Sequence, residues 1–396
     1  MQNNRRSLLI NLTLGILTAI GSISIDIYLP AFSVMADYFQ VPMVRIESTV
    51  TVFLFGMALG QLFIGPLSDV WGRKIPLRIG LTVYIICSIC CMLTGSFILF
   101  LCLRFIQGLA GSSCQVISRA LVGDLYHGKN AAHVFTLLQI LMAVSPILAP
   151  MAGGMLAESG NWKFLFLIMA GVSALALSGC LTVLPAGRAA SDNKQLNFKG
   201  IRKAYAICIK NPAFINYALV RSVSNSAAFS FVTASPFVFT QIYAVSKRHY
   251  GFIFSGLAVG IIFIGLINTW LLRRFEVRTI TKSAVVGQMI VGILIILTVY
   301  FHLPLAVLVV LIFLFLSLLG LILPNATALY LHALPDFGGS ASALIGSMSY
   351  LSAFLITSLL SLIHNDTAYP MVFMMFSCAF VAFICLQYRR NHSEHQ

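Results

Sequence analysis

The chain alternates between long apolar runs and short polar or charged segments. A helix that crosses a bilayer needs about 20 mainly apolar residues. Dividing the sequence at its charges, glycines and prolines predicts twelve such helices in one all-α membrane protein. They cover residues 8–32, 47–67, 76–95, 98–120, 132–156, 163–184, 213–240, 250–271, 281–300, 304–327, 340–363 and 369–388.

Composition supports a multi-pass membrane protein. Hydrophobic residues make up 59% of the chain and charged residues only 9%, whereas soluble domains carry about 25% charged residues. The net charge of +14 does not indicate nucleic-acid binding, because the Lys and Arg residues lie in short gaps between apolar runs rather than on one water-facing surface. The cysteines lie mostly within apolar runs and predict neither a disulfide framework nor a metal site.

The basic residues also predict an orientation. With twelve spans both termini share one side, and 18 of the 25 Lys and Arg residues fall on that side against four on the other. The positive-inside rule then places both termini in the cytoplasm, and we expect the chain in a bacterial inner membrane. Arg5 and Arg6 precede an apolar run as in a signal peptide, but the many later spans favour a retained first helix.

The longest connection predicts the domain organisation. Residues 185–211 separate the sixth span from the seventh and carry several basic residues. We expect a six-helix half at 1–184, a cytoplasmic linker at 185–211, and a second six-helix half with a short tail at 212–396. Many secondary transporters have two such halves, with the substrate site near the middle of the bilayer.

Asp26 is the main candidate for chemistry. It lies in the stretch Ser24-Ile25-Asp26-Ile27-Tyr28-Leu29-Pro30 of the first apolar run, and a charge at that depth costs roughly 3 kcal/mol on insertion scales. Burial raises the pKa of a carboxyl group and a nearby cation lowers it. Asp26 is the acid that we place deep within a span, so we expect it to couple protons. The alternative is a helix cap or a fixed partner of an arginine.

The loop between the second and third spans carries the first family motif, Gly65-Pro66-Leu67-Ser68-Asp69-Val70-Trp71-Gly72-Arg73-Lys74. Gly72 permits a tight turn, and Asp69 is placed to meet Arg73. The stretch resembles the loop signature of the major facilitator superfamily. The resemblance implies a twelve-helix fold in two halves and a conformational latch made by Gly65, Asp69, Gly72, Arg73 and Lys74, with Arg119 and Asp124 as candidate additions.

Two further stretches resemble signatures of the same superfamily. Arg104, Gln107 and Gly108 resemble its fourth-helix signature, which implies that Arg104 takes part in proton coupling, although a purely structural role stays open. In the fifth span, Pro146, Pro150, Gly153 and Gly154 resemble the signature of drug and proton antiporters, with Ser145 and Ala149 in place of two glycines. Bent, small-residue helices of this kind also pack closely against neighbours.

The stretch around Asp26 closely resembles the first helix of the Bcr/CflA branch of multidrug efflux transporters. Residues 230–238 and 339–344 agree with that branch, so the resemblance covers both halves. It implies proton-driven export of small organic compounds. Side chains that we expect to line an amphipathic substrate cavity are Tyr28, Gln107, Gln115, Gln139, Arg221, Asn225, Phe229, Phe231 and Asn325. Any one aromatic ring among them is more often a packing residue, and Asn325 has the alternative of satisfying backbone freed by Pro324.

The sequence favours transport over catalysis. It contains no phosphate-binding loop of the Walker type and no nucleophile-and-base arrangement, and its eight histidines are scattered. We therefore expect a monomeric proton and drug antiporter that needs no cofactor and uses protons as the coupling ion. The alternatives are a proton-coupled carrier of a natural metabolite, such as an amino-acid derivative or a siderophore, in either direction, and a membrane sensor that transports nothing.

Overall fold

A computed structural model of the chain describes residues 2–126, 128–185, 198–333 and 338–393. Regular structure within these residues is helical, with no strand. The fold divides into two compact units, Met1–Lys199 and Gly200–Gln396. Of the predicted linker at 185–211, residues 186–197 lie outside the described part, and residues Phe198–Lys210 form a short helix that the apolar pattern did not predict.

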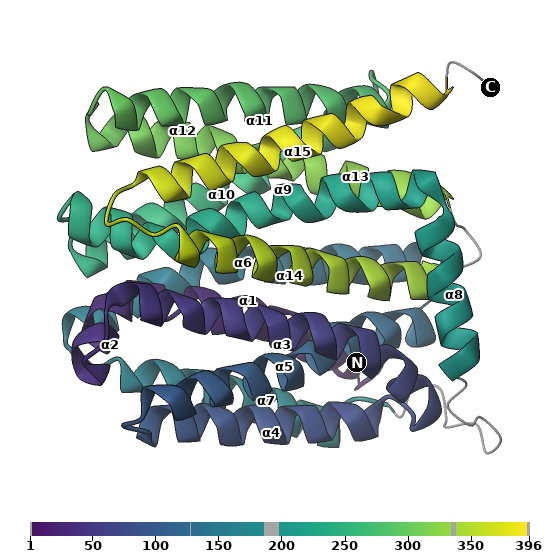
Figure 1. Cartoon of the computed structure of the whole chain (residues 1–396). Helices are drawn as coiled ribbons and strands as arrows, with labels where there is room; N and C mark the ends of the chain where they lie inside the picture. The colour runs from purple at the N-terminus through teal and green to yellow at the C-terminus, as the bar shows by residue number, and fades with distance from the viewer. Residues whose placement is uncertain (1, 127, 186–197, 334–337, 394–396) are drawn as a thin grey trace. The chain divides into compact units, whose positions relative to one another are not determined.

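Unit 1 contains the first six predicted spans. Its elements are α1 (Gln2–Asp26), the 3-10 turn η1 (Leu29–Ala31), α2 (Phe32–Phe39), α3 (Met43–Val70), α4 (Lys74–Leu93), α5 (Phe97–Leu125), α6 (Gly128–Glu158) and α7 (Lys163–Thr182). Helix α3 packs along α5, α4 packs against both α5 and α7, and α1 packs against α6 (Figure 1). The first predicted span, 8–32, is therefore a broken helix rather than a continuous one.

Unit 2 begins within the basic helix α8 (Phe198–Lys210). Its elements are α9 (Pro212–Phe237), the π-helical turn η2 (Val238–Ile242), α10 (Lys247–Leu271), α11 (Val277–Tyr300), α12 (Leu305–Ser317), α13 (Leu319–Ala333), α14 (Gly338–Leu362) and α15 (Tyr369–Ser393). Helix α9 packs against α13, α14 and α15. Asn211 caps α9 by accepting from the backbone N–H groups of Ala213 and Phe214, each at 3.0 Å, and Pro212 suits the first helical position.

Small residues bring the helices of unit 1 into backbone contact. A side chain at Gly56 of α3 would collide with the carbonyl oxygen of Phe105 on α5, and a side chain at Gly108 of α5 would collide with that of Phe53 on α3. Such close approach is typical of membrane helices, because lipid gives no hydrophobic drive for helices to associate and packing has to supply it. The α3–α5 pair thus forms a rigid base for the side chains of the site.

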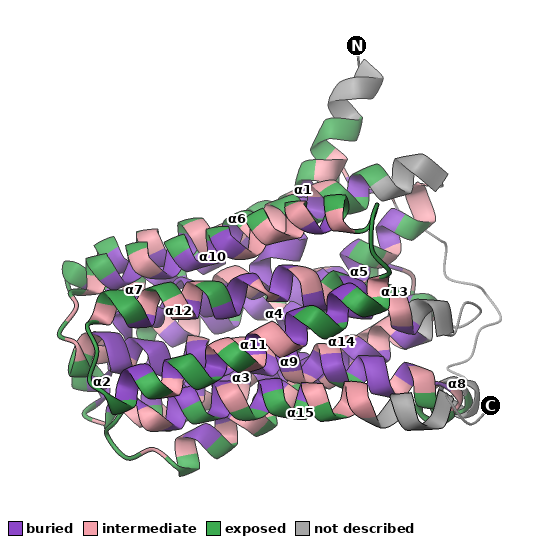
Figure 2. Ribbon diagram, turned by 90° about the horizontal axis from the view of Figure 1, so that it is seen from above, coloured by how far each residue is buried: buried purple, intermediate pink, exposed green. Residues whose placement is uncertain are grey.

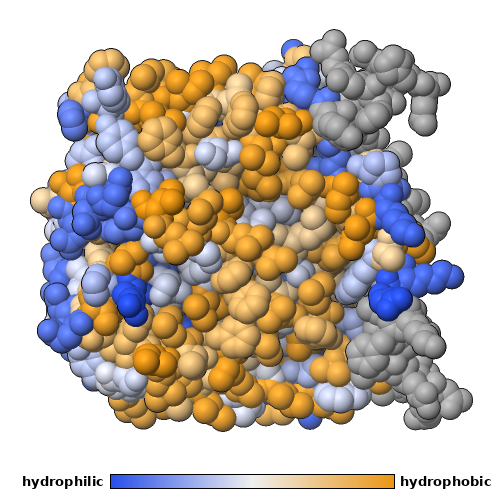
Figure 3. Space-filling model, in the orientation of Figure 1, coloured by the Kyte–Doolittle hydropathy of each residue, from blue (hydrophilic) through white to orange (hydrophobic). Residues whose placement is uncertain are grey.

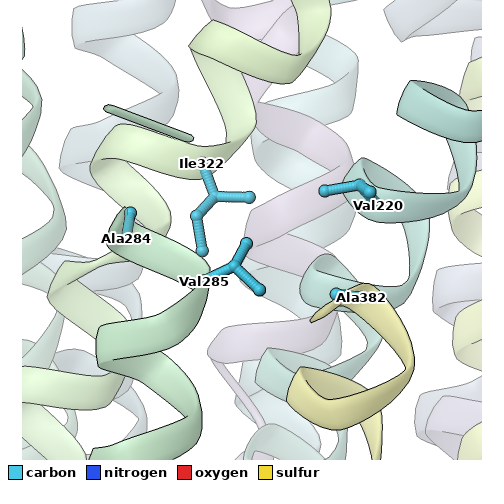
Figure 4. Close-up of a cluster of buried hydrophobic side chains, with 5 residues drawn as sticks. All are labelled: Val220, Ala284, Val285, Ile322 and Ala382. Atoms are coloured by element: carbon cyan, nitrogen blue, oxygen red, sulfur yellow. The ribbon is translucent and has the colours of Figure 1, made fainter. Parts of the chain in front are cut away.

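The core of unit 2 includes an apolar cluster at the meeting of several helices. Val220 of α9, Ala284 and Val285 of α11, Ile322 of α13 and Ala382 of α15 are buried together (Figure 4). Leu318, Leu321, Phe383, Cys385 and Leu386 pack against this cluster. Helices that are distant in the sequence are therefore held by aliphatic packing.

The outer faces of the helices are apolar as well. Exposed and buried residues alternate along the same helices (Figure 2), and the exposed set includes many large hydrophobic side chains, such as Phe63, Ile98 and Leu362. On the face seen in Figure 3, hydrophobic residues cover the flanks of the helices and hydrophilic residues gather towards their ends. Apolar surface of this extent fits contact with lipid acyl chains.

Length and composition identify 11 candidate membrane spans in the described part of the chain. They match all the predicted spans except the seventh, which is α9. This helix is less apolar because it carries Arg221 and several serines, and some of these serines bond within the unit: Ser226 donates to Ser352 Oγ at 2.9 Å. The chain is a multi-pass membrane protein with a helical fold, as the sequence predicts.

Candidate functional site

Helix α1 ends at Asp26, inside the first candidate span, Ser7–Phe39. The backbone then turns: Ile27 N–H donates to the Ile23 carbonyl at 3.2 Å, and Ala31 N–H donates to the Tyr28 carbonyl at 3.0 Å. Pro30 contributes to the break, since proline has no N–H and disfavours helical geometry at the residue before it. Discontinuous helices of this kind often form the binding sites of transporters.

The carboxyl group of Asp26 is nearly enclosed, with 7% of the residue exposed. Within the described residues, Asp26 takes part in none of the ion pairs or side-chain hydrogen bonds. An unpaired charge in an apolar interior is unfavourable. Asp26 therefore sits where taking up or losing a proton has a large energetic consequence.

Arg104 of α5 stabilises the end of α1. It is fully buried, and its Nη2 donates to the Ser24 carbonyl at 3.0 Å. Carbonyl groups in the last turn of a helix lack their usual partners, so a cation there completes the hydrogen bonding and meets the negative end of the helix dipole. The sequence suggested Arg104 as a partner for the Asp26 carboxyl; in this structure its described bonds go elsewhere.

Aromatic and amide side chains complete the surroundings of Arg104. Its guanidinium carbon lies 4.5 Å from the ring centre of Tyr28 and 4.4 Å from that of Phe53, so cation–π attraction helps to hold the buried charge. Its Nη1 donates to Gln107 Oε1 at 2.5 Å, and Gln107 Nε2 donates to Ser88 Oγ at 2.7 Å. Gln107 is thus engaged in fixing Arg104.

Hydroxyl pairs fix both sides of the break in the first span. Before Asp26, the Ser24 hydroxyl is hydrogen-bonded to the Tyr84 hydroxyl of α4. After it, Tyr28 Oη and Thr49 Oγ1 of α3 lie 2.9 Å apart. Together with the bond from Arg104 of α5, these pairs hold the segment that contains Asp26 against three helices, α3, α4 and α5.

The fifth predicted span packs directly on this segment. A side chain at Gly153 of α6 would collide with the Ile27 carbonyl oxygen, and it would lie 3.4 Å from Pro30 Cδ. Gly154 and Pro150 are buried nearby in the sequence, whereas Pro146 is partly exposed. The small residues that we expected to pack closely in this motif therefore make a specific contact, with the backbone immediately after Asp26.

The remaining candidates in unit 1 have different environments. Gln115 is buried, and its Oε1 accepts from Gln61 Nε2 at 3.1 Å. Gln139 lies on an exposed position of α6. Gln115 is thus enclosed within the unit like Tyr28 and Gln107, whereas Gln139 is accessible.

Three of the candidates in unit 2 share a face of α9. Arg221, Asn225 and Phe229 are all partly exposed and follow the predicted spacing of four residues. Arg221 donates through Nε to Thr327 Oγ1 at 3.0 Å and through Nη1 to Ser349 Oγ at 2.7 Å. The Phe229 ring lies 6.2 Å from that of Tyr350. This row combines a cation, an amide and an aromatic ring.

Phe231 and Asn325 lie inside unit 2 instead. Phe231 is buried and stacks on Phe254, with 5.7 Å between ring centres. Asn325 and Asn268 of α10 exchange two amide hydrogen bonds of 2.9 and 3.1 Å. Both side chains are used in packing α9, α10 and α13 together.

The loop motif forms a charged cluster at the end of α3. Gly72 has a φ of 76°, a conformation that favours glycine. Arg73 pairs with Asp69 at 2.7 Å and with Asp124 of α5 at 2.9 Å. Burial lowers the pKa of Arg73, but hydrogen bonding and charge from the two carboxylates outweigh it, so the pKa lies above its ordinary value. The cluster joins α3, the turn and α5.

The other members expected in this motif are placed less centrally. Arg119 is exposed on α5, and Gly65 and Lys74 are partly exposed. Asp124, by contrast, is mostly enclosed, whereas the side chain of Asp69 is 60% exposed. Asp124 is therefore the less solvent-screened partner of Arg73.

One buried acid was missed in the sequence. Glu47 lies in the second turn of α3, is 1% exposed, and has an Oε1 atom with no hydrogen-bond partner. Its position beside Arg45 and Ser48 looked like the polar end of a span. The available signal was its helical spacing with Val50 and Leu54, three and seven residues further on, which are both fully buried. Elsewhere in the described residues, no group of three His, Cys, Asp or Glu side chains is arranged to hold a metal ion.

Comparison with known proteins agrees with this architecture. A bicyclomycin resistance protein homolog of Haemophilus influenzae is 29% identical over 96% of each chain. The multidrug resistance protein MdtL of Escherichia coli is 30% identical over 68% of each chain. Among solved structures, the nucleoside transporter NupG superposes with a TM-score of 0.74 at 13% identity, covering 96% of this chain and 99% of that one.

A second solved structure, a D-xylose-proton symporter, superposes with a TM-score of 0.73 at 13% identity, covering 94% of this chain and 97% of that one. At that identity the two structures establish the fold alone. Residues 14–357 match the sequence model of the Major Facilitator Superfamily. Together with the multidrug-resistance relatives, this match confirms the resemblance read from the motifs: the chain belongs to the Major Facilitator Superfamily.

Proposed function

We propose that this protein exports small organic compounds in exchange for protons. The observation that carries the proposal is the enclosed, unpaired carboxyl of Asp26 at the break in the first span. The multidrug-resistance relatives support the class of substrate. No cofactor is required, because the proton gradient supplies the free energy.

In the proposed cycle, Asp26 holds a proton while its surroundings are dry. It releases the proton when movement of the helices admits water or brings a cationic substrate close, since both favour the charged form. Arg104 has a positioning role: it fixes the end of α1 through the Ser24 carbonyl. The coupling therefore depends on the backbone of the break as well as on the carboxyl.

For substrate contact in unit 2 we propose the side chains on α9 with accessible surface, namely Arg221, Asn225 and Phe229; in unit 1, taken by itself, the accessible candidate is Gln139 on α6. Aromatic and amide groups together suit drug-like compounds, which need apolar contact and a few polar anchors. The buried candidates would shape the interior of their own units, Tyr28, Gln107 and Gln115 in unit 1 and Phe231 and Asn325 in unit 2. Arg221 also suits an anionic metabolite, which is the second candidate substrate.

We further propose a bacterial inner membrane location with both termini in the cytoplasm, on the basis of the 18 to four distribution of basic residues. A fluorescent protein that folds only in the cytoplasm, fused after Gln396, should be bright. If the fluorescent fusion were dark, and a phosphatase that is active only in the periplasm were active when fused at the same point, this orientation would be contradicted.

The function is tested by flux and by drug susceptibility. Purified protein in liposomes should move ethidium against its concentration gradient when a pH gradient is imposed, and an uncoupler should stop the movement. Cells that lack their own efflux pumps should become more resistant when they express the wild type, and Asp26→Asn should remove this resistance. Gradient-driven movement of an anionic metabolite, without movement of ethidium or other drugs in the panel, would favour the second candidate.

A further inference from the structure

We propose that Glu47 is a second proton-carrying carboxyl of the transport cycle. This inference rests on the proposed function, since it concerns how many protons accompany each substrate. It starts from an unexplained feature of unit 1: a fully enclosed glutamate whose Oε1 atom has no hydrogen-bond partner.

The position of Glu47 separates it from the charged loop cluster. Glu47 lies near the start of α3, whereas Asp69 lies near its end at Val70. Twenty-two residues of helix at about 1.5 Å each place the two some 33 Å apart. Glu47 therefore belongs to the opposite end of unit 1, close to the exposed Arg45 and to helix α2.

The neighbouring elements supply no ionic partner for Glu47 in this structure. The elements with the larger contacts on α3 are α2, α4 and α5, and the segment that follows Asp26 at the end of α1 meets α3 through Tyr28 and Thr49. Their charged and titratable side chains are Asp37 and Tyr38 on α2, Lys74, Arg78, Tyr84, Cys87, Cys90 and Cys91 on α4, and Cys102, Arg104, Cys114, Arg119 and Asp124 on α5. Within the described residues, Glu47 forms no ion pair with any of them.

Each of these charged groups and tyrosines is exposed to solvent, is already hydrogen-bonded to another residue, or lies far from Glu47. Asp37 and Tyr38 are exposed, and Tyr84 is hydrogen-bonded to Ser24. Arg104 directs its two Nη atoms to Gln107 and to the Ser24 carbonyl. Lys74, Arg78, Arg119 and Asp124 lie at the end of the helices that carries the loop cluster. A buried carboxylate with neither a cation nor a full set of donors is strongly unfavourable, so the protonated acid is the form that fits this enclosure.

The contact nearest in sequence to both acids joins the backbone segments that carry them, although Glu47 itself points to another side of α3 than Thr49. Tyr28 follows Asp26 by two residues, Thr49 follows Glu47 by two residues, and the hydroxyl oxygens of Tyr28 and Thr49 lie 2.9 Å apart. Because Tyr28 is hydrogen-bonded to Thr49, movement of α1 against α3 during the cycle would shift the backbone that carries Glu47 together with the backbone that carries Asp26. A conformation that opens the α2 end of unit 1 would hydrate Glu47 and let its proton exchange with the solution on that side.

A second exchanging proton makes the transport of a monovalent cation electrogenic. With one proton exchanged for one ethidium ion, no net charge moves, and a membrane potential alone does not drive transport. With a further proton on Glu47, net charge moves and the potential becomes a driving force. The variant Glu47→Gln keeps the shape of the protonated acid and removes only its ability to exchange.

The first test counts protonated carboxyl groups directly. Infrared difference spectra of the full-length protein in liposomes, recorded while the pH is raised, should show a carboxylic C=O band that disappears in Glu47→Gln. The matched control is Asp37→Asn, an exposed acid on α2, which should leave that band unchanged. A Glu47→Gln spectrum identical to that of the wild type would overturn the proposal.

The second test asks whether that proton moves in the cycle. Wild-type liposomes should move ethidium when only a potassium-diffusion potential is imposed, Glu47→Gln should move it only with a pH gradient, and Glu47→Asp should restore part of the response to potential. Undiminished potential-driven transport by Glu47→Gln would contradict the inference. A wild type that moves no compound under any gradient contradicts the proposed function instead, while the infrared band still decides whether Glu47 holds a proton.

Discussion

Arg104 holds the site together through hydrogen bonds and ring contacts as well as through its charge. Its planar guanidinium bonds the Ser24 carbonyl and Gln107 while lying against Tyr28 and Phe53. A lysine keeps the charge but provides neither the fork of donors nor the flat face.

We therefore predict that Arg104→Lys lowers the stability of the protein by about 2 kcal/mol, the usual value of buried hydrogen bonds to a charged group, and slows gradient-driven transport. Thermal unfolding in detergent and ethidium flux measure the two effects. The control is Arg45→Lys, an exposed position on α3. Equal behaviour of the two variants would mean that the fork and stacking geometry of Arg104 is dispensable.

At the residue scale, the sequence predicted which side chains belong to the buried site better than it predicted the contacts that they make. Asp26 and Arg104 stood out because charges within apolar runs are rare, and both are buried in the structure. Their environments were not predictable, because the bond from Arg104 to the Ser24 carbonyl exists only once α1 ends near that residue. Glu47 was missed because an acid at the edge of an apolar run resembles an ordinary helix terminus, and only the covering elements reveal its burial.

At the scale of helices, α6 approaches the backbone of the break after Asp26 closely. A methyl group at position 153 would meet the Ile27 carbonyl, and overpacking of this kind typically costs about 1–3 kcal/mol. Because the backbone at Ile27 adjoins Asp26, a displacement there also moves the carboxyl.

We predict that Gly153→Ala impairs proton-driven export strongly, whereas Gly171→Ala on α7 does not, since an added methyl at Gly171 meets nothing within 4 Å. Export is measured as ethidium flux in liposomes, and thermal unfolding verifies that each variant is folded. Normal flux in a folded Gly153→Ala protein would show that the α6 contact does not matter for coupling.

The loop cluster gives a second prediction at this scale. Arg73 joins Asp69 and Asp124, but only the Asp124 side chain is mostly enclosed, and exposed ion pairs contribute little. Asp124→Asn should therefore slow turnover more than Asp69→Asn does, with little change in substrate affinity. Substrate binding and flux are compared with those of Glu158→Gln, an exposed acid on α6. The opposite order, or unchanged turnover in both variants, would count against a latch centred on Arg73.

Helix positions were predictable because apolar runs of bilayer length have few alternatives. The predicted spans 98–120 and 281–300, for example, lie within α5 and α11. The break at Asp26 was not predicted, because Ile27, Tyr28 and Leu29 continue the apolar pattern and hide the effect of Pro30. Helix α8 was not predicted either, since its 13 residues are too short to span and lie in a basic linker.

For the whole molecule, composition and spacing were enough to give the fold, and motif spacing was enough to give the family. In the proposed function, what the chain carries across the membrane depends on side chains such as Arg221 and Phe229, and spacing alone does not predict which compound they bind. The central claim, that substrate and proton compete through Asp26, does not depend on knowing the natural substrate.

That claim has one direct measurement. When ethidium is added to purified wild-type protein in weakly buffered detergent solution, substrate binding should release protons, detected as a fall in pH, and Asp26→Asn should bind ethidium without this release. Asp37→Asn, which removes an exposed acid, should release protons as the wild type does. Equal proton release by wild type and a folded Asp26→Asn protein would contradict the account.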